Sequence, residues 1–126
     1  MGARCCPNAD KCECDPCGVS TRKAKTEISY LTPTDEATLS AELAELRLAS
    51  YRYRGDLDDG RTHVGYILED SPAAASSDLA RSRVDLYTYT SMAVAAIHAQ
   101  DRRIDALELE LRDLKARQDR LEGKRQ

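Results

Sequence analysis

The spacing of hydrophobic residues predicts a short amphipathic helix as the first folded element of the chain. The helix opens at Thr32-Pro33, where Pro33 suits a first helical position and Asp35 completes an acidic variant of the capping box. Leucines then recur at intervals that place them on one face of a helix: Leu39, Leu43 and Leu46. We expect this helix to span about residues 33–48.

The period of the pattern shortens to two in the segment that follows. Tyr51 and Tyr53 alternate with arginines, residues 55–60 supply turn-forming Gly and Asp, and a second alternating run comes next. This second run contains Val64, Tyr66 and Leu68. The pattern predicts a β-hairpin. Residues 71–78, SPAAASSD, are small and polar, and we expect them to form a flexible connection.

From residue 84 the pattern is helical, and no Pro or Gly interrupts it before Gly123. The helix carries heptads with one core position occupied by Ile97, Ile104 and Leu111. The complementary position is occupied by Leu107, Leu114 and Leu121, and Gln100 and Gln118 lie in the same stripe. Such a seam predicts a coiled coil over about residues 90–122.

The charges beside this seam favour a parallel, in-register association of identical chains. In a parallel pairing each g residue faces the e residue of the next heptad on its neighbour. The facing pairs are all attractive: Arg103 with Glu108, Glu110 with Lys115, and Arg117 with Glu122. Ile and Leu in the core favour two strands, whereas the Gln layers leave a trimer open. The alternative is an amphipathic helix that packs on its own body.

Composition strengthens the case for association. The chain has 126 residues, a third of them charged, with no Trp, no Phe and six Tyr, so one protomer buries only a small core. A net charge of −3 without a basic stripe argues against a nucleic-acid partner. No apolar run has the length of a membrane span, and no signal peptide is recognisable, so we expect no membrane partner and a cytoplasmic location.

The five cysteines all fall in the first 17 residues, which sets a Cys-rich head, residues 1–19, apart from the rest. Their thiolates are candidate ligands for zinc or iron: Cys5, Cys6, Cys12, Cys14 and Cys17. Cys14 and Cys17 form a CxxC pair, but a second well-spaced pair is lacking. Bridges between chains and reduced thiols in a poorly ordered tail therefore stay open as alternatives.

A polar, basic run, GVSTRKAKTEIS, joins this head to the first helix and places Ser20 five residues before Lys25. A linker would account for the run without chemistry. A serine hydroxyl becomes nucleophilic when a neighbouring base takes its proton, and a lysine held neutral can be that base. Residues five apart lie on different faces of a helix or strand, so the two side chains must meet in a bend or across chains. His63 is a less suitable base, since a hairpin histidine is more often a packed or surface residue.

Several stretches carry a resemblance to a known family: LRLASYRYR, HVGYILEDSP and VDLYTYTSMAVAAIHAQDRRIDALE. They are similar to the helix-to-hairpin join, a strand and the final helix of the C-terminal intramolecular chaperone domain of phage endosialidases and tail fibres, the S74 peptidase family. The resemblance covers about residues 20–122, and its strongest motif is His63, Val64, Gly65 and Tyr66. The run STRKAKTEI also resembles the family's opening, with Ser20, Lys25 and Ile28 in step and Thr21 where Asp is usual.

The resemblance implies an α+β, mainly helical fold: a short helix, a β-hairpin arm and a long C-terminal helix in a parallel trimeric coiled coil. It implies that residues 20–126 trimerise, help an upstream passenger to fold, and release themselves by autoproteolysis between Val19 and Ser20. Ser20 would be the nucleophile and Lys25 its base, with no cofactor required. The expected partners are two further copies of the chain and the passenger. Assembly would occur in the cytoplasm, and whether the assembled protein then becomes part of a phage-like or exported fibre particle stays open.

A second function stays open beside this one. Residues 1–19 are either the end of a longer passenger or a small cargo in their own right, and trimerisation would bring the cysteines of all copies together. Thr21 and the short upstream segment favour a trimeric assembly module that no longer cleaves itself. Such a module would display the Cys-rich head, with or without a metal, as a binding tip.

Overall fold

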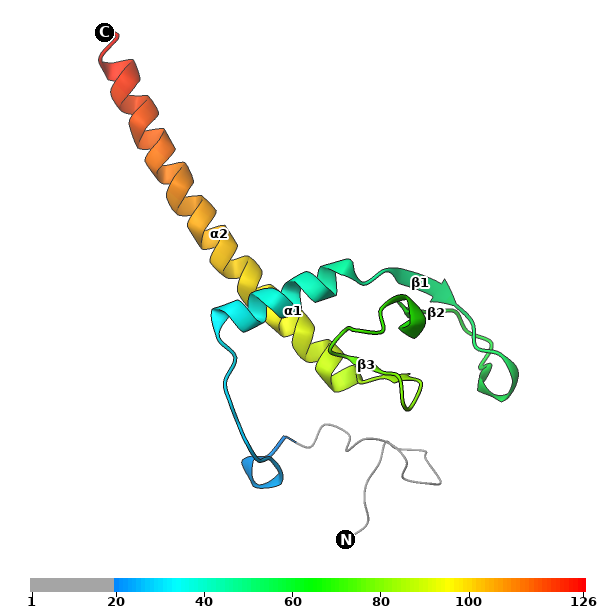
Figure 1. Ribbon diagram of the computed structural model, residues 1–126. Coiled ribbons are helices and arrows are strands. Elements are labelled where there is room, and N and C mark those ends of the chain that lie inside the picture. The colour runs from blue at the N-terminus through cyan, green and yellow to red at the C-terminus, as the bar shows by residue number, and fades with distance from the viewer. Residues whose placement is uncertain (1–19) are drawn as a thin grey trace.

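The computed structural model describes residues 20–126, which form a mainly helical α+β fold (Figure 1). A short helix, α1 (Pro33–Glu45), and a long helix, α2 (Leu86–Gly123), are its main elements. Two small antiparallel hairpins lie between them: β1 (Leu48–Tyr51) with β2 (His63–Tyr66), and β3 (Ser77–Asp78) with β4 (Arg83–Val84). Single 3-10 turns complete the fold: η1 (Arg22–Ala24), η2 (Gly55–Leu57) and η3 (Leu68–Asp70). The predicted order of short helix, hairpin arm and long helix is confirmed.

The start of α1 is the predicted capping box. Thr32 Oγ1 accepts from the Asp35 backbone N–H at 3.2 Å, and Asp35 Oδ2 accepts from the Thr32 backbone N–H at 2.7 Å. The hydrogen bonds from the Thr32 side chain and backbone lower the pKa of Asp35. The helix ends at Glu45 and not near residue 48, because Leu48 pairs with Tyr66 as the first residue of β1.

The hairpin arm forms, but with strand limits that the alternating pattern did not predict. The strands pair from Leu48 with Tyr66 to Tyr51 with His63, so Tyr53 lies beyond β1. Leu68, expected in the second strand, belongs to the 3-10 turn η3. In the loop between the strands, Gly55 and Gly60 have φ angles of +61° and +74°, which favour glycine over residues with a side chain.

The connection at residues 71–78 contributes Ser76 to the core and is held by hydrogen bonds, whereas the sequence predicted a flexible connection. Ser76 is fully buried, and its Oγ lies 2.8 Å from the hydroxyl of Tyr66. Ser77 begins β3, and its Oγ donates to the Ser71 carbonyl at 2.7 Å. Small side chains allow this segment to fold tightly against the Tyr66 ring, and its hydroxyls satisfy groups that would otherwise be buried without partners.

The long helix begins at Leu86, later than the expected residue 84, because Val84 pairs with Ser77 in the second hairpin. Its N-terminal half packs against α1 and buries Met92, Ala95 and Ala96. Its C-terminal half extends away from the other described elements in Figure 1, and every residue from 100 to 126 is exposed. Helices in proteins are stabilised mainly by packing of their apolar face, and in one protomer the apolar seam of this half packs against no other described element.

Candidate active site

The side chains of Ser20 and Lys25 meet at the N-terminal edge of the described fold. Lys25 Nζ donates to Ser20 Oγ at 2.9 Å. This distance is within the range of a hydrogen bond between a nucleophile and its base. The structure therefore brings together the two residues that the resemblance to the S74 peptidase family implied as a pair.

The meeting occurs in a bend within one chain, which was one of the two arrangements expected for residues at this spacing. The 3-10 turn η1 lies between the two residues and reverses the chain, with the Ala24 backbone N–H donating to the Thr21 carbonyl at 3.0 Å. Thr21 precedes the turn, and its side chain makes no capping hydrogen bond to it. The segment after the turn is tied down by Arg22, whose guanidinium donates to the Tyr30 hydroxyl at 3.1 Å.

A third side chain, Tyr87, completes the contacts of the pair. The Tyr87 hydroxyl lies 3.0 Å from Ser20 Oγ, although the two residues are 67 positions apart in sequence. Lys25 Nζ lies 5.9 Å from the centre of the Tyr87 ring, within the range of a cation–π contact. Tyr87 belongs to the first turn of α2, so the long helix anchors the segment that carries Ser20.

The sequence places Tyr87 in the final helix but gives no indication that it belongs to the site. No local pattern could have done so, because the contact joins two ends of the fold. The one available signal was its position: a tyrosine in the first helical turn, beside the capping residue Asp85, is well placed to extend its hydroxyl beyond the helix.

The site is open to solvent in a single protomer. Ser20 and Lys25 are both exposed, and Tyr87 is 52% exposed. A lysine acts as a base only in its neutral form, which removal from water favours. A neighbouring chain or the upstream segment would have to cover the site to exclude water from it.

The other predicted site groups fall outside the described residues. Val19, on the acyl side of the expected scissile bond, and all five cysteines lie in the segment before Ser20. Within residues 20–126, no group of three or more His, Cys, Asp or Glu side chains is arranged to hold a metal ion.

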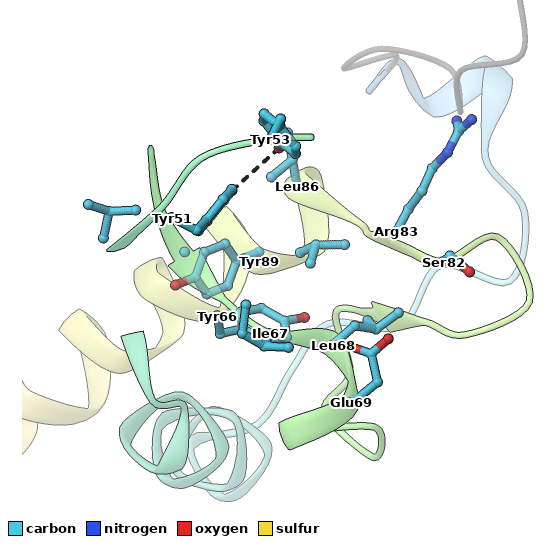
Figure 2. A pocket seen from close by; sticks show the side chains of 13 residues that line it. Tyr51, Tyr53, Tyr66, Ile67, Leu68, Glu69, Ser82, Arg83, Leu86 and Tyr89 are labelled. Atoms are coloured by element: carbon cyan, nitrogen blue, oxygen red, sulfur yellow. Dashed lines mark hydrogen bonds between the residues drawn. The ribbon is translucent and has the colours of Figure 1, made fainter. Parts of the chain in front are cut away.

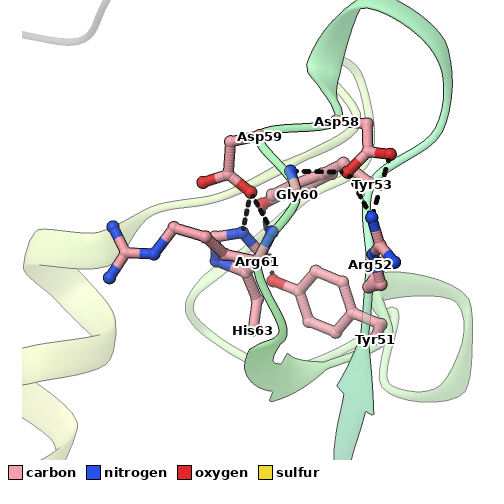
Figure 3. A network of polar contacts seen from close by, with 8 residues as sticks. All are labelled: Tyr51, Arg52, Tyr53, Asp58, Asp59, Gly60, Arg61 and His63. Atoms are coloured by element: carbon pink, nitrogen blue, oxygen red, sulfur yellow. Dashed lines mark hydrogen bonds and ion pairs between the residues drawn. The ribbon is translucent and has the colours of Figure 1, made fainter.

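His63 takes part in a separate polar network in the hairpin arm (Figure 3). Its Nε2 lies 3.0 Å from Asp59 Oδ1, and its ring packs against the rings of Tyr51 and Tyr53. The hydrogen bond from His63 is the main cause of a lowered pKa at Asp59. In the same loop Arg52 pairs with Asp58 at 3.3 Å. The interactions of His63 are thus those of a packed arm residue, as the sequence indicated.

A groove of about 590 Å³ lies between the arm and the second hairpin (Figure 2). Tyr51, Tyr53, Tyr66 and Tyr89 contribute much of its wall. The Tyr66 and Tyr89 rings meet edge to face with their centres 5.5 Å apart. The groove is therefore lined in part by aromatic rings, of which that of Tyr66 is buried.

No helix among the described residues has the length and apolar character needed to cross a membrane. Comparison of the chain with family models, with curated proteins and with solved structures returned no match. Function is therefore inferred from the residues and their geometry.

Proposed function

We propose that residues 20–126 form a trimerisation and folding chaperone that releases itself from the upstream segment by cleavage between Val19 and Ser20. The observation that carries this proposal is the 2.9 Å hydrogen bond between Lys25 Nζ and Ser20 Oγ. The resemblance to the S74 peptidase family led to the same two residues from the sequence. The contact forms without any neighbouring chain, which favours cleavage of each protomer by its own pair.

The position of Ser20 directly after the scissile bond determines the chemistry. Its Oγ can reach the Val19 carbonyl carbon through a five-membered ring, so the attack is an N-to-O acyl shift. Neutral Lys25 takes the Oγ proton as the new C–O bond forms. The C–N bond then breaks, and the Ser20 nitrogen takes the proton from Lys25 to become a free amine. Water hydrolyses the resulting ester, which gives the Val19 carboxylate and restores the Ser20 hydroxyl.

The proposed assembly rests on the exposed seam of α2. The apolar residues at the core heptad positions are all exposed in one protomer: Ile97, Ile104, Leu107, Leu111, Leu114 and Leu121. The residues that the same helix buries, Met92, Ala95 and Ala96, occupy heptad positions other than those of this seam. Parallel copies of the chain would cover the seam while α1 stays in place. Three copies agree with the family resemblance and with the Gln layers at Gln100 and Gln118.

The test is the intact mass of freshly expressed protein under reducing conditions. Wild type is expected to appear as two pieces divided between Val19 and Ser20, whereas Ser20→Ala and Lys25→Ala remain whole. Cleavage that persists in both variants would exclude this pair as the cause. Sedimentation of all three proteins measures assembly separately, and each is expected to run as a trimer.

A second candidate function is a trimeric assembly module that displays the Cys-rich head without cleaving itself. The exposure of Ser20 and Lys25 favours it, because water surrounds the proposed base in a single protomer. The absence of a side-chain cap at Thr21 also leaves η1 less constrained than a capped turn would be. This function predicts that wild type stays whole and still sediments as a trimer.

A further inference from the structure

The Tyr87 side chain contacts both members of the Ser20 and Lys25 pair. Its hydroxyl lies 3.0 Å from Ser20 Oγ, and its ring centre lies 5.9 Å from Lys25 Nζ. Ser20 Oγ is thus placed between two polar groups, the amine of Lys25 and the phenol of Tyr87. The contact between Lys25 and Ser20 does not require Tyr87, so the role of the Tyr87 hydroxyl at Ser20 Oγ needs its own explanation.

The orientation of Tyr87 is set by the start of α2. Asp85 Oδ1 accepts from the backbone N–H groups of Tyr87 and Thr88, both at 3.0 Å. Asp85 Oδ2 accepts from the Thr88 hydroxyl, and the hydrogen bonds from Thr88 are the leading cause of a lowered pKa at Asp85. The backbone at Tyr87 is therefore held by a capped helix, and its hydroxyl is directed by a rigid element.

The hydrogen-bonding capacity of a serine hydroxyl indicates what Tyr87 does. A serine oxygen has one proton to donate and two lone pairs to accept with. When Lys25 is neutral, Ser20 O–H donates to Nζ, and Oγ is free to accept from the Tyr87 hydroxyl. As the proton moves to Lys25, negative charge develops on Oγ, and a hydrogen bond to a charged oxygen is stronger than one to a neutral oxygen. The phenol then stabilises the nucleophile at the moment when it is formed.

We propose that Tyr87 is a third catalytic residue, which donates a hydrogen bond to Ser20 Oγ as that oxygen loses its proton to Lys25. This inference rests on the proposed self-cleavage and adds a residue to it. The proton that Tyr87 shares with Oγ stays on the phenol, so the proton balance of the acyl shift is unchanged. The ring of Tyr87 also faces the ammonium that Lys25 becomes, which favours the charge that the transfer creates.

The test compares the rates of cleavage of variants made by cell-free synthesis. The rate is measured as the appearance over time of the released fragment, residues 20–126, by mass spectrometry. Tyr87→Phe keeps the ring and removes only the hydroxyl, so cleavage is expected to slow by about tenfold to a hundredfold, the usual effect of one hydrogen bond to a charged group. The matched control is Tyr89→Phe in the next part of the same helix, whose ring packs against Tyr66. Its rate is expected to equal that of wild type.

Folding is measured independently of cleavage by placing Tyr87→Phe in the uncleavable Ser20→Ala chain. Helix content and sedimentation are expected to match those of Ser20→Ala alone. If Tyr87→Phe cleaves at the wild-type rate, the role of Tyr87 is overturned while the proposed self-cleavage stands. If the variant is slow because it loses helix or assembly, the catalytic role is also overturned. Wild type that never cleaves removes both the inference and the function on which it rests.

Discussion

The hydroxyl of Tyr66 is the polar centre of a very small core. It lies 2.8 Å from Ser76 Oγ and 3.1 Å from Ser77 Oγ, and Ser76 is fully buried. Within residues 20–126, every buried side-chain nitrogen or oxygen has a hydrogen-bond partner. A core with few apolar side chains depends strongly on such contacts, because an unpaired buried hydroxyl opposes folding.

Tyr66→Phe is therefore expected to lower the free energy of unfolding by about 1–2 kcal/mol, since it leaves the buried Ser76 hydroxyl without this partner. The measurement is the urea unfolding midpoint at a fixed protein concentration, because the proposed assembly would make stability depend on concentration. Tyr30→Phe is the matched control. Tyr30 is 80% exposed, and its loss of a hydroxyl is expected to change the free energy of unfolding by less than about 0.5 kcal/mol. Equal losses in the two variants would show that the buried hydroxyl has no special role.

At the scale of elements, the carboxylate of Glu36 in α1 adds two polar contacts to the packing of α1 on α2. Glu36 Oε1 lies 2.8 Å from His98 Nδ1, and Glu36 Oε2 lies 2.7 Å from the Arg102 guanidinium. The hydrogen bond with His98, followed by that with Arg102, lowers the pKa of Glu36 below its usual 4.5. The folded state therefore favours the ionised carboxylate.

This lowered pKa predicts how stability depends on pH. The contribution of Glu36 is complete above 4.5 and is lost as the pH falls through the lower pKa of the folded state. Glu36→Gln is expected to destabilise the protein at neutral pH and to show a smaller further loss on acidification than wild type. Urea midpoints measured from neutral pH to below 4.5 provide the check.

The control for this prediction is Asp113→Asn, at an exposed pair with Arg117 within α2, since Asp113 lies outside the core positions of the heptads and the positions that flank them. Its pH dependence is expected to follow that of wild type, because exposed pairs contribute little. A parallel pH dependence in wild type and Glu36→Gln would mean that Glu36 does not stabilise the contact between α1 and α2.

At the scale of the whole molecule, the exposed seam of α2 predicts the behaviour of the chain in solution. Leu107 occupies a core heptad position, whereas Leu109 lies two residues further on and outside the seam; their exposed fractions are 45% and 68%. An Asp substitution at Leu107 tests burial between chains, and the same substitution at Leu109 tests for a general effect of the charge on the helix.

If the chain assembles as proposed, Leu107→Asp is expected to dissociate the trimer, because assembly would bury a carboxylate from each chain at one level of the coil. Leu109→Asp is expected to leave the trimer intact, since that position faces water in the assembled coil. Sedimentation velocity of both variants beside wild type measures the outcome. Dissociation by Leu109→Asp with retention by Leu107→Asp would require a different seam, and a wild-type monomer would exclude the coiled coil.

The amino-acid sequence by itself determined the features that depend on near neighbours. The capping box at Thr32 and Asp35, the arm and the long helix follow from side chains within a few residues of one another, and the structure confirms them. The pairing of Ser20 with Lys25 was implied by the resemblance to the S74 peptidase family, and in the structure a single short turn brings the two side chains together.

Tertiary structure alone decided the features that join distant segments. Pairing of Leu48 with Tyr66 ends α1 early, and pairing of Val84 with Ser77 delays the start of α2. Contact with the Tyr66 hydroxyl accompanies the burial of Ser76, in a segment whose local composition favours exposure. The contact of Tyr87 with Ser20 spans 67 residues. Propensity and periodicity describe the secondary structure that a segment favours by itself. The ends of the helices, the burial of Ser76 and the position of Tyr87 depend instead on contacts with residues that are distant in sequence.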